Sequence, residues 1–332
     1  MFVKFILITL VFISTNVFAI SLSEKIEEIR SAFPNAAMAV GVVNKDKVIF
    51  QSFHGSQNLE TQTPIDEQSL FMIGSTTKAF TSTALGKLVE QGVIDWDQAV
   101  QSIIPEFQLM PPIDSSLITI RDLLLHMTGL PRHDLVWITQ RFSMEHFLSL
   151  LPFLEPSYSR GEKWQYNNLM YMVAGMAAGR ANNSSWTDVV QDYLLNELKM
   201  DSTYFTVDDV INLPNVATPY YYINGTSTKR KLRNIDGIGP AGSIHSNIND
   251  MTKWLRMNLN KGTFSGKEIV SRNIINEIHR GQIEISRGNW FPELTDSKYG
   301  FAWTEANYRN HKIIRHGGSI NSYLTHIAFF PE

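Results

Sequence analysis

The pattern of apolar and polar positions predicts a hairpin of two strands, then a block of helices, then further strands. The runs from Met38 to Val43 and from Val48 to Phe53 are apolar and rich in β-branched residues, and turn-forming residues 44–47 join them. Helical signals dominate from Asp95 to about Glu197. Three closing strands are expected at Tyr299 to Glu305, Lys312 to His316 and Leu324 to Phe330. This order predicts one α/β domain with a large helical insertion.

Several of the expected helices have clear signals at their ends. A helix that begins at Ser75 should end at Glu90, because Gly92 is a natural C-cap. Thr119 and Asp122 resemble a capping box that starts another helix. The remaining helices are expected at residues 22–33, 97–104, 143–151, 168–180, 186–198 and 249–259. The polar stretch after Ser271 does not resemble a buried strand.

Composition places the chain among ordinary globular proteins. It has 332 residues, of which 43% are hydrophobic and 18% charged, so a sizeable core can form. No linker-like tract or repeat divides it, and we expect one domain at residues 20–332. Within it we expect a sheet part at about 20–80 and 241–332, and a helical part at about 81–240. A net charge of −3 gives no indication of a nucleic-acid surface.

The N-terminus resembles a targeting segment. Lys4 precedes an apolar run at residues 5–13, and residues 17–19 offer small side chains at the positions that a signal peptidase reads. This predicts a signal peptide at residues 1–19 and a secreted or extracytoplasmic protein. The run is too short for a comfortable membrane span, although an uncleaved anchor remains the alternative.

The absence of cysteine excludes disulfides, thiolate metal sites and a cysteine nucleophile. The chain has no H-E-x-x-H motif, no tight cluster of metal ligands and no glycine-rich phosphate loop. We therefore expect neither a metal nor a cofactor, and any chemistry must come from serine, lysine, tyrosine or histidine.

Ser75 and Lys78 are the strongest chemical candidates. Residues three apart share a face of a helix, and no other serine in the chain has a lysine three residues later. A serine hydroxyl needs a nearby base, and a desolvated lysine can serve as one. Backbone N–H groups at a helix N-terminus can receive an oxyanion. The alternative is a serine N-cap with a solvated lysine one turn later.

Tyr166 and Asn168 lie where a loop is expected to join a buried helix, so their side chains can point into a cleft. The same Tyr-x-Asn pattern occurs at Tyr222 and Tyr308, but those tyrosines lie in a predicted turn and in a polar connection. A buried structural tyrosine is the alternative for Tyr166.

The segment His316-Gly317-Gly318-Ser319 follows a predicted strand. Paired glycines in a strand are typical of a bulge or of a place where a ligand meets the backbone. The alternative is a bulge with a surface histidine. The stretch from Lys298 to Gly300 is a rival match, but it begins a strand and lacks the glycine pair.

The order Ser-x-x-Lys, Tyr-x-Asn, His-x-Gly resembles the serine beta-lactamase superfamily. It is most similar to the class C branch with its related D,D-peptidases and esterases, including the animal beta-lactamase-like serine proteases. The stretches 123–130, 239–242 and 299–303 fit the same family. The resemblance implies an antiparallel sheet with flanking helices and an all-helical subdomain.

The resemblance also implies roles. Ser75 would be acylated by a carbonyl substrate, while Lys78 and Tyr166 share the general base and acid work. Asn168 would hold the lysine and a substrate amide. His316 and Gly318 would line the substrate site, and the backbone N–H groups of Ser75 and Ser319 would form the oxyanion hole. His316-Gly317-Gly318 stands where many lactamases have Lys-Thr-Gly, which removes a permanent cation and disfavours penicillin-like substrates.

We therefore predict a secreted serine hydrolase that forms an acyl-enzyme with a small ester, an amide or a short peptide. Two alternatives stay open, namely a true beta-lactamase or D,D-peptidase, and a catalytically silent binding or scaffold protein of the same fold. The only partner implied is the substrate, with no nucleic acid and no stable membrane insertion after signal removal.

The resemblance implies one more expectation. In the family, a central strand lies between the one ending here at Phe330 and the N-terminal hairpin, and a terminal helix covers the sheet. The sequence stops at Glu332 with neither element. The hairpin would then share no ladder with the strand of His316, and both would present unpaired edges. We expect such a form to be incomplete and poorly stable.

Overall fold

A computed structural model describes residues 21–33, 35–285 and 292–332. The predicted signal peptide at residues 1–19 lies outside this part of the chain. Among the described residues, no helix combines the length and the apolar character needed to cross a membrane.

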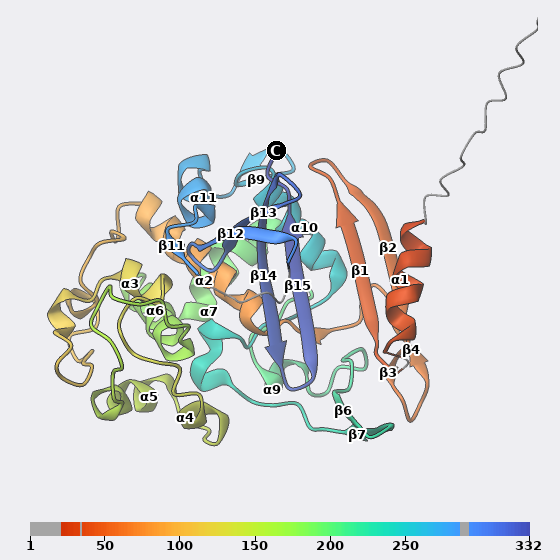
Figure 1. Ribbon diagram of the computed structural model, residues 1–332, viewed down its shortest axis with the longest axis horizontal. Coiled ribbons are helices and arrows are strands. Elements are labelled where there is room, and N and C mark those ends of the chain that lie inside the picture. Colours follow the sequence, from red (N-terminus) through yellow and green to blue (C-terminus); the bar gives the residue numbers. More distant parts are fainter. Residues whose placement is uncertain (1–20, 34, 286–291) are drawn as a thin grey trace, which may run out of the picture.

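The largest sheet is antiparallel, has five strands in the order β11-β12-β13-β14-β15, and lies beside a separate hairpin of β1 and β2. Figure 1 shows the long strands β14 and β15 between the helical part on one side and the hairpin with α1 on the other. The strands of the sheet are β11 (Ile283–Glu284), β12 (Leu294–Tyr299), β13 (Thr304–Tyr308), β14 (His311–Ile320) and β15 (Tyr323–Phe329). The hairpin consists of β1 (Met38–Val43) and β2 (Val48–His54). The fold is the mixed α/β fold with an antiparallel sheet and flanking helices that the sequence predicts.

The rest of the described chain consists of helices, short strand pairs and the loops that join them. The α-helices are α1 (Leu22–Ser31), α2 (Thr77–Glu90), α3 (Ile120–Leu124), α4 (Leu135–Ile138), α5 (Met144–Leu150), α6 (Asn168–Ala181), α7 (Trp186–Val190), α8 (Asn196–Leu198), α9 (Val207–Val210), α10 (Ile248–Leu259) and α11 (Arg272–His279). Short 3₁₀ turns are η1 (Gly74–Thr76), η2 (Val100–Ser102), η3 (Ser115–Leu117), η4 (Leu151–Phe153) and η6 (Asp236–Ala241), and η5 (Gln191–Leu195) is a π-helical turn. The short strands are β3 (Ser56–Asn58), β4 (Thr63–Pro64), β5 (Phe71–Met72), β6 (Tyr220–Ile223), β7 (Thr226–Lys229), β8 (His245–Ser246), β9 (Thr263–Phe264) and β10 (Lys267–Glu268).

Helices α2 and α6 form the centre of the core. Nearly every residue of both is buried, which is the expected state of a helix that is apolar or small on all sides. Phe80 of α2 stacks on Trp254 with ring centroids 4.0 Å apart. At Gly175 of α6 a Cβ would overlap the ring of Pro240, so only glycine permits this approach. Because α2 carries Lys78 and α6 carries Asn168, core packing holds both polar side chains in place.

Most of the predicted elements are confirmed. The hairpin has the expected strands, and α2 ends at Glu90 with Gly92 at a φ of +71° just beyond it. Thr119 and Asp122 form a reciprocal capping box at the start of α3. The turn after Tyr222 joins β6 to β7 through Asn224, whose φ is +50°.

Other predictions are wrong. The helix expected at 97–104 is only the turn η2. The strand expected at Tyr299 to Glu305 is the end of β12, a turn and the start of β13, where Gly300 N–H donates to Trp303 O at 2.7 Å and Ala302 has a φ of +68°. Its apolar side chains are buried by the core rather than by a strand face. By contrast, the polar stretch after Ser271 contains α11, an amphipathic helix, which agrees with the expectation that it is not a buried strand.

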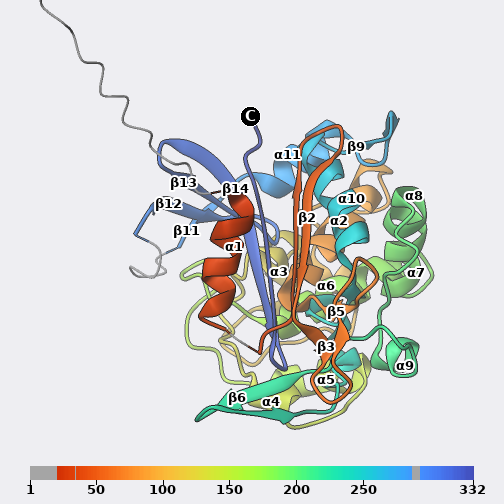
Figure 2. The same cartoon turned by 90° about the vertical axis from the view of Figure 1, so that its right-hand side faces the viewer.

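Within the described residues, the hairpin shares no ladder with the five-stranded sheet. This agrees with the expectation, but the edge strand is β15 and not the strand of His316, because β14 pairs with β13 and with β15. Helix α10 contacts both β1 and β15 and so packs across the space between them (Figure 2).

Candidate active site

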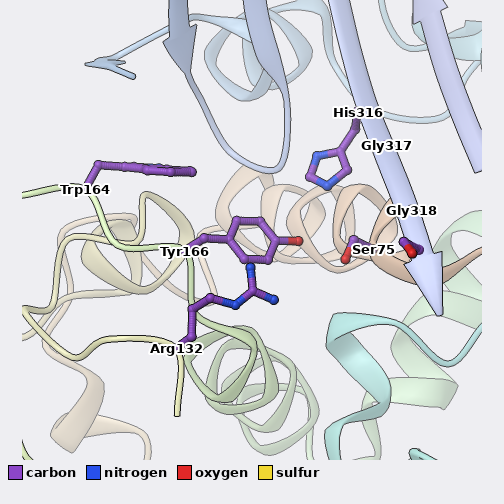
Figure 3. A pocket seen from close by; sticks show the side chains of 8 residues that line it. Ser75, Arg132, Trp164, Tyr166, His316, Gly317 and Gly318 are labelled. Atoms are coloured by element: carbon purple, nitrogen blue, oxygen red, sulfur yellow. The ribbon is translucent and has the colours of Figure 1, made fainter. Parts of the chain in front are cut away.

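Ser75 lies on a turn between a strand and a buried helix. Strand β5 pairs with β8, the turn η1 follows, and α2 begins at Thr77. Gly74 precedes the serine with a φ of +55°, a conformation that glycine adopts without a steric cost. The hydroxyl of Ser75 therefore sits at the N-terminal end of α2, facing a pocket (Figure 3).

Lys78 is completely buried below Ser75. Its Nζ donates to Asn168 Oδ1 and to the carbonyl oxygen of Ala241, each at 2.7 Å, and lies 3.3 Å from Ser75 Oγ. The first two partners are oxygen acceptors, so a neutral amine would use both of its N–H groups on them. Its lone pair would then face the serine hydroxyl, which is the arrangement that a base requires.

The electrostatic surroundings favour this neutral form. Burial lowers the pKa of the Lys78 amine well below its ordinary value, and the positive charge of Arg132 lowers that pKa further. The negative charge of Asp134 acts in the opposite direction. Lys78 can therefore accept a proton at a pH where an exposed lysine is fully charged.

Tyr166 lies on the opposite side of the serine from β14, with its hydroxyl directed toward Ser75 (Figure 3). Lys78 Nζ is 4.8 Å from the centre of its ring, and the His126 ring centroid is 4.5 Å from that of Tyr166. The next residue, Asn167, caps α6 by accepting the N–H of Met170 at 3.1 Å. The loop-to-helix junction expected from the sequence thus places Tyr166 in the pocket and Asn168 on the lysine.

His126 fixes this junction, and the sequence assigned it no role. It is buried with a φ of +59°, and its Nδ1 accepts the backbone N–H of Asn167 at 3.1 Å. Nε2 therefore carries the proton of a neutral ring and lies 3.2 Å from the hydroxyl of Tyr299. The stretch 123–130 was noted as a family feature, and its position beside Tyr166 comes only from the tertiary structure.

His316 is oriented by a hydrogen bond from the turn after β12. Its Nδ1 donates to the carbonyl oxygen of Ala302, and the ring is buried and turned toward the space between Tyr166 and Ser75 (Figure 3). Strand β14 continues through the glycine pair in regular register, with Gly317 opposite His326. The alternatives of a bulge and of a surface histidine are therefore both wrong.

Gly318 brings the backbone of β14 against that of Ser75. A Cβ at this position would overlap the carbonyl oxygen of Ile73 and lie 3.1 Å from the backbone nitrogen of Ser75. A Cβ on Gly74 would likewise lie 3.0 Å from the backbone nitrogen of Ser319. The backbones of Ser75 and Ser319 are thus side by side, where two N–H groups can act on one oxygen.

We expect Gly318→Ala to lower stability by about 1–3 kcal/mol, because the added methyl group overpacks a filled site. The change in midpoint of chemical denaturation measures this loss. Gly317→Ala is the matched control, since its Cβ would meet atoms no closer than 3.7 Å. Equal stability of the two variants would contradict the close approach of β14 to Ile73.

The pocket at this site has a volume of about 580 Å³, which suits a small molecule or a short peptide segment. The residues that line it are Ser75, Arg132, Trp164, Tyr166, His316, Gly317, Gly318 and Ser319. The structure therefore gathers the candidates from all three motifs, and it adds Arg132 and Trp164, which the sequence did not indicate. The rival tyrosines Tyr222 and Tyr308 are not among the lining residues.

Asp134 links the pocket to the buried lysine. Its Oδ2 accepts Arg132 Nε at 2.6 Å, while its Oδ1 accepts Trp137 Nε1 at 2.9 Å and Asn168 Nδ2 at 3.4 Å. Asn168 in turn accepts a hydrogen bond from Lys78. One carboxylate thus orients a cation at the pocket and the amide that holds the lysine.

Comparisons with known proteins show which family and which fold this chain resembles. Residues 26–332 match the family model described as Beta-lactamase. The unguisins hydrolase ungD' of Aspergillus campestris is 28% identical over 282 residues, which cover 81% of this chain and 52% of that protein. The chain spans about half the length of the curated relatives it matches.

Solved structures show the same fold at low sequence identity. The octameric penicillin-binding protein homologue from Pyrococcus abyssi has a TM-score of 0.82 and 22% identity, over 93% of this chain and 70% of that chain. A class C beta-lactamase from Rhodobacter sphaeroides has a TM-score of 0.74 and 19% identity, over 93% and 90% of the two chains.

Proposed function

The chain belongs to the beta-lactamase family, and from this premise we propose that it is a serine hydrolase acting through an acyl-enzyme on Ser75. The observation that carries the proposal is the position of Lys78, which is buried, has a pKa lowered by that burial and lies 3.3 Å from Ser75 Oγ. A lysine with a merely structural role has no need of a lone pair directed at a serine.

The proposed reaction begins when Ser75 Oγ attacks the carbonyl carbon of the substrate and Lys78 Nζ takes the hydroxyl proton. The carbonyl oxygen becomes negative and accepts from the backbone N–H groups of Ser75 and Ser319. As the bond to the leaving group breaks, Tyr166 and Lys78 return a proton to it. Water then cleaves the acyl-enzyme, with its proton passing to the same groups and Ser75 regaining its hydrogen.

We assign the substrate to small esters, amides or short peptides. A relative that is named a hydrolase supports hydrolysis, and the pocket volume suits a small acyl group. His316 takes the place of the lysine that resembling lactamases have in the third motif, which disfavours a penicillin-like substrate.

The test compares a chromogenic cephalosporin with a short p-nitrophenyl ester, beside labelling by a fluorophosphonate probe. Turnover of the ester and labelling, with little turnover of the cephalosporin, is the expected result. Comparable turnover of both would indicate a beta-lactamase. Neither turnover nor labelling would indicate a silent binding protein and contradict the proposal.

We also propose that the protein is exported, on the basis of its apolar N-terminal segment. Expression in a secreting host followed by N-terminal sequencing should give a mature chain that begins at Ile20. A mature chain that retains Met1 would contradict cleavage.

The pH dependence should follow the charges around Lys78. A lysine base works when neutral, so activity rises with pH through its pKa. Arg132→Gln removes a charge that lowers this pKa, and the acidic limb of kcat/KM should move to higher pH. Asp134→Asn removes a charge that raises it, and the limb should move to lower pH.

The pH profile of a neutral ester measures both shifts, because the substrate itself does not titrate. The groups that face Lys78 besides these two are Ser75, Tyr166, Asn168 and Tyr171. Limb movements of the same sign in both variants would contradict the assignment of the limb to Lys78.

A further inference from the structure

We propose that Arg132 recognises a carboxylate on the substrate, so that the site prefers anionic esters, amides or peptides to neutral ones of the same size. The proposal rests on the proposed hydrolase function and names its substrate class. Arg132 lies on the loop before α4 and lines the pocket together with Ser75 and Tyr166.

The guanidinium group is held in one position by two contacts. Its Nε donates to Asp134 Oδ2 at 2.6 Å, and its Cζ lies 5.1 Å from the centre of the Tyr166 ring. Figure 3 shows the guanidinium group beside this ring, across the pocket from β14. A cation over an aromatic face is attracted to it, and the contact adds rigidity to a long side chain.

The backbone before Arg132 is also fixed. The Asn167 Nδ2 group donates to the carbonyl oxygen of Leu130 at 3.2 Å and to that of Pro131 at 2.6 Å. Asn167 follows Tyr166 directly and caps α6. One residue therefore anchors both the backbone before the arginine and the start of the helix after the tyrosine, which links the positions of these two pocket residues.

The donors of Arg132 are only partly used. Its fork has five N–H groups, and Asp134 takes the one on Nε. In the part of the chain that the structure describes, Nη1 and Nη2 have no hydrogen-bond acceptor, and the side chain is 55% exposed. Two parallel donors at the edge of a pocket match the two oxygens of a carboxylate.

Stability alone does not explain this ion pair. A half-exposed pair such as Arg132 with Asp134 contributes little to folding. The charge matters more in the pocket, because among its eight described lining residues Arg132 alone is permanently charged. The sequence lacks the lysine that many lactamases have in the third motif. In the structure, Arg132 provides a positive charge from the wall of the pocket that faces β14 (Figure 3).

The test uses four esters of similar size. Two are charged, namely the mono-p-nitrophenyl ester of adipate with a carboxylate in the acyl part, and the hexanoate of 3-hydroxy-4-nitrobenzoate with a carboxylate in the leaving group. Their neutral counterparts are p-nitrophenyl hexanoate and o-nitrophenyl hexanoate, and kcat/KM of each charged ester is divided by the value of its neutral counterpart. Arg132 also changes the pKa of Lys78, but this effect is the same for charged and neutral esters. It therefore cancels in the ratio.

In Arg132→Gln the ratio for at least one charged ester should fall about 10- to 100-fold, as expected for a lost hydrogen bond between charged groups. Arg132→Lys should retain part of the preference. Arg160→Gln is the matched control, because Arg160 is a similarly exposed arginine that pairs with Asp122 outside the pocket. Unchanged ratios in Arg132→Gln for both charged esters would overturn the proposal.

Failure of the hydrolase function gives a different result, namely that the wild-type protein cleaves none of the four esters and takes no label. In that case binding of adipate, measured by calorimetry, decides the role of Arg132. Binding that weakens about 10-fold or more in Arg132→Gln supports carboxylate recognition, whereas equal or absent binding in both proteins refutes it.

Discussion

Ser75→Ala is expected to abolish labelling by a fluorophosphonate probe and to lower ester turnover by about 10⁴-fold or more. The nucleophile forms the covalent bond on which both observations depend, and the oxyanion donors that remain give only a small residual rate. Mass spectrometry of the labelled peptide should place the probe on residue 75. The readout is the rate of ester hydrolysis together with the fraction of protein labelled.

Ser149→Ala serves as the control, because Ser149 is an exposed serine on α5 whose hydroxyl donates to the carbonyl oxygen of His146. Its labelling and turnover should equal those of the wild-type protein. Labelling that survives in Ser75→Ala would show that another serine is the nucleophile.

The parts of the site that depend on local geometry could be predicted from the sequence. Ser75 and Lys78 share a helix face whatever surrounds them, and Tyr166 and Asn168 flank a helix start marked by Asn167. Capping residues, hairpin turns and the end of α2 follow from the same short-range rules.

The parts of the site that depend on tertiary contacts could not be predicted from the sequence. Arg132 lies in a loop with no periodic pattern, and its position is set by Asn167, which is 35 residues later in the chain. The apolar run at residues 301–303 resembles a strand, but it forms a turn because the core, not a neighbouring strand, buries it. Similarly, no local signal shows that β14 needs Gly318 for its approach to Ile73.

These contacts between residues far apart in the sequence also determine the pKa of Lys78 and how neighbouring charges change it. Lys78 would be an ordinary cation in solution, and burial between α2, α6 and η6 lowers its pKa, as the proposed role of a base requires. Arg132 and Asp134 then influence it with opposite sign from the pocket side. The same arginine can thus help to keep the base neutral and bind an anionic substrate.

Lys78→Arg is expected to lower turnover by about a hundredfold or more, the usual effect of losing a general base. Arginine keeps its proton at any working pH, so it cannot accept the hydrogen of Ser75. Its guanidinium is also larger than the site between Asn168 and Ala241, which holds the amine at 2.7 Å from each oxygen. Thermal unfolding of the variant must therefore be measured beside its rate, and Lys78→Met provides a second variant of similar length without a charge.

Lys87→Arg on the same helix is the control, since Lys87 is near the surface and pairs with Glu90 three residues later. It should keep both stability and rate. If Lys78→Met remains folded, as judged by a cooperative unfolding transition, and still loses turnover, the effect belongs to the base and not to the fold. An arginine or methionine variant at position 78 with near wild-type turnover would contradict the role of Lys78, because neither side chain can take up the serine proton.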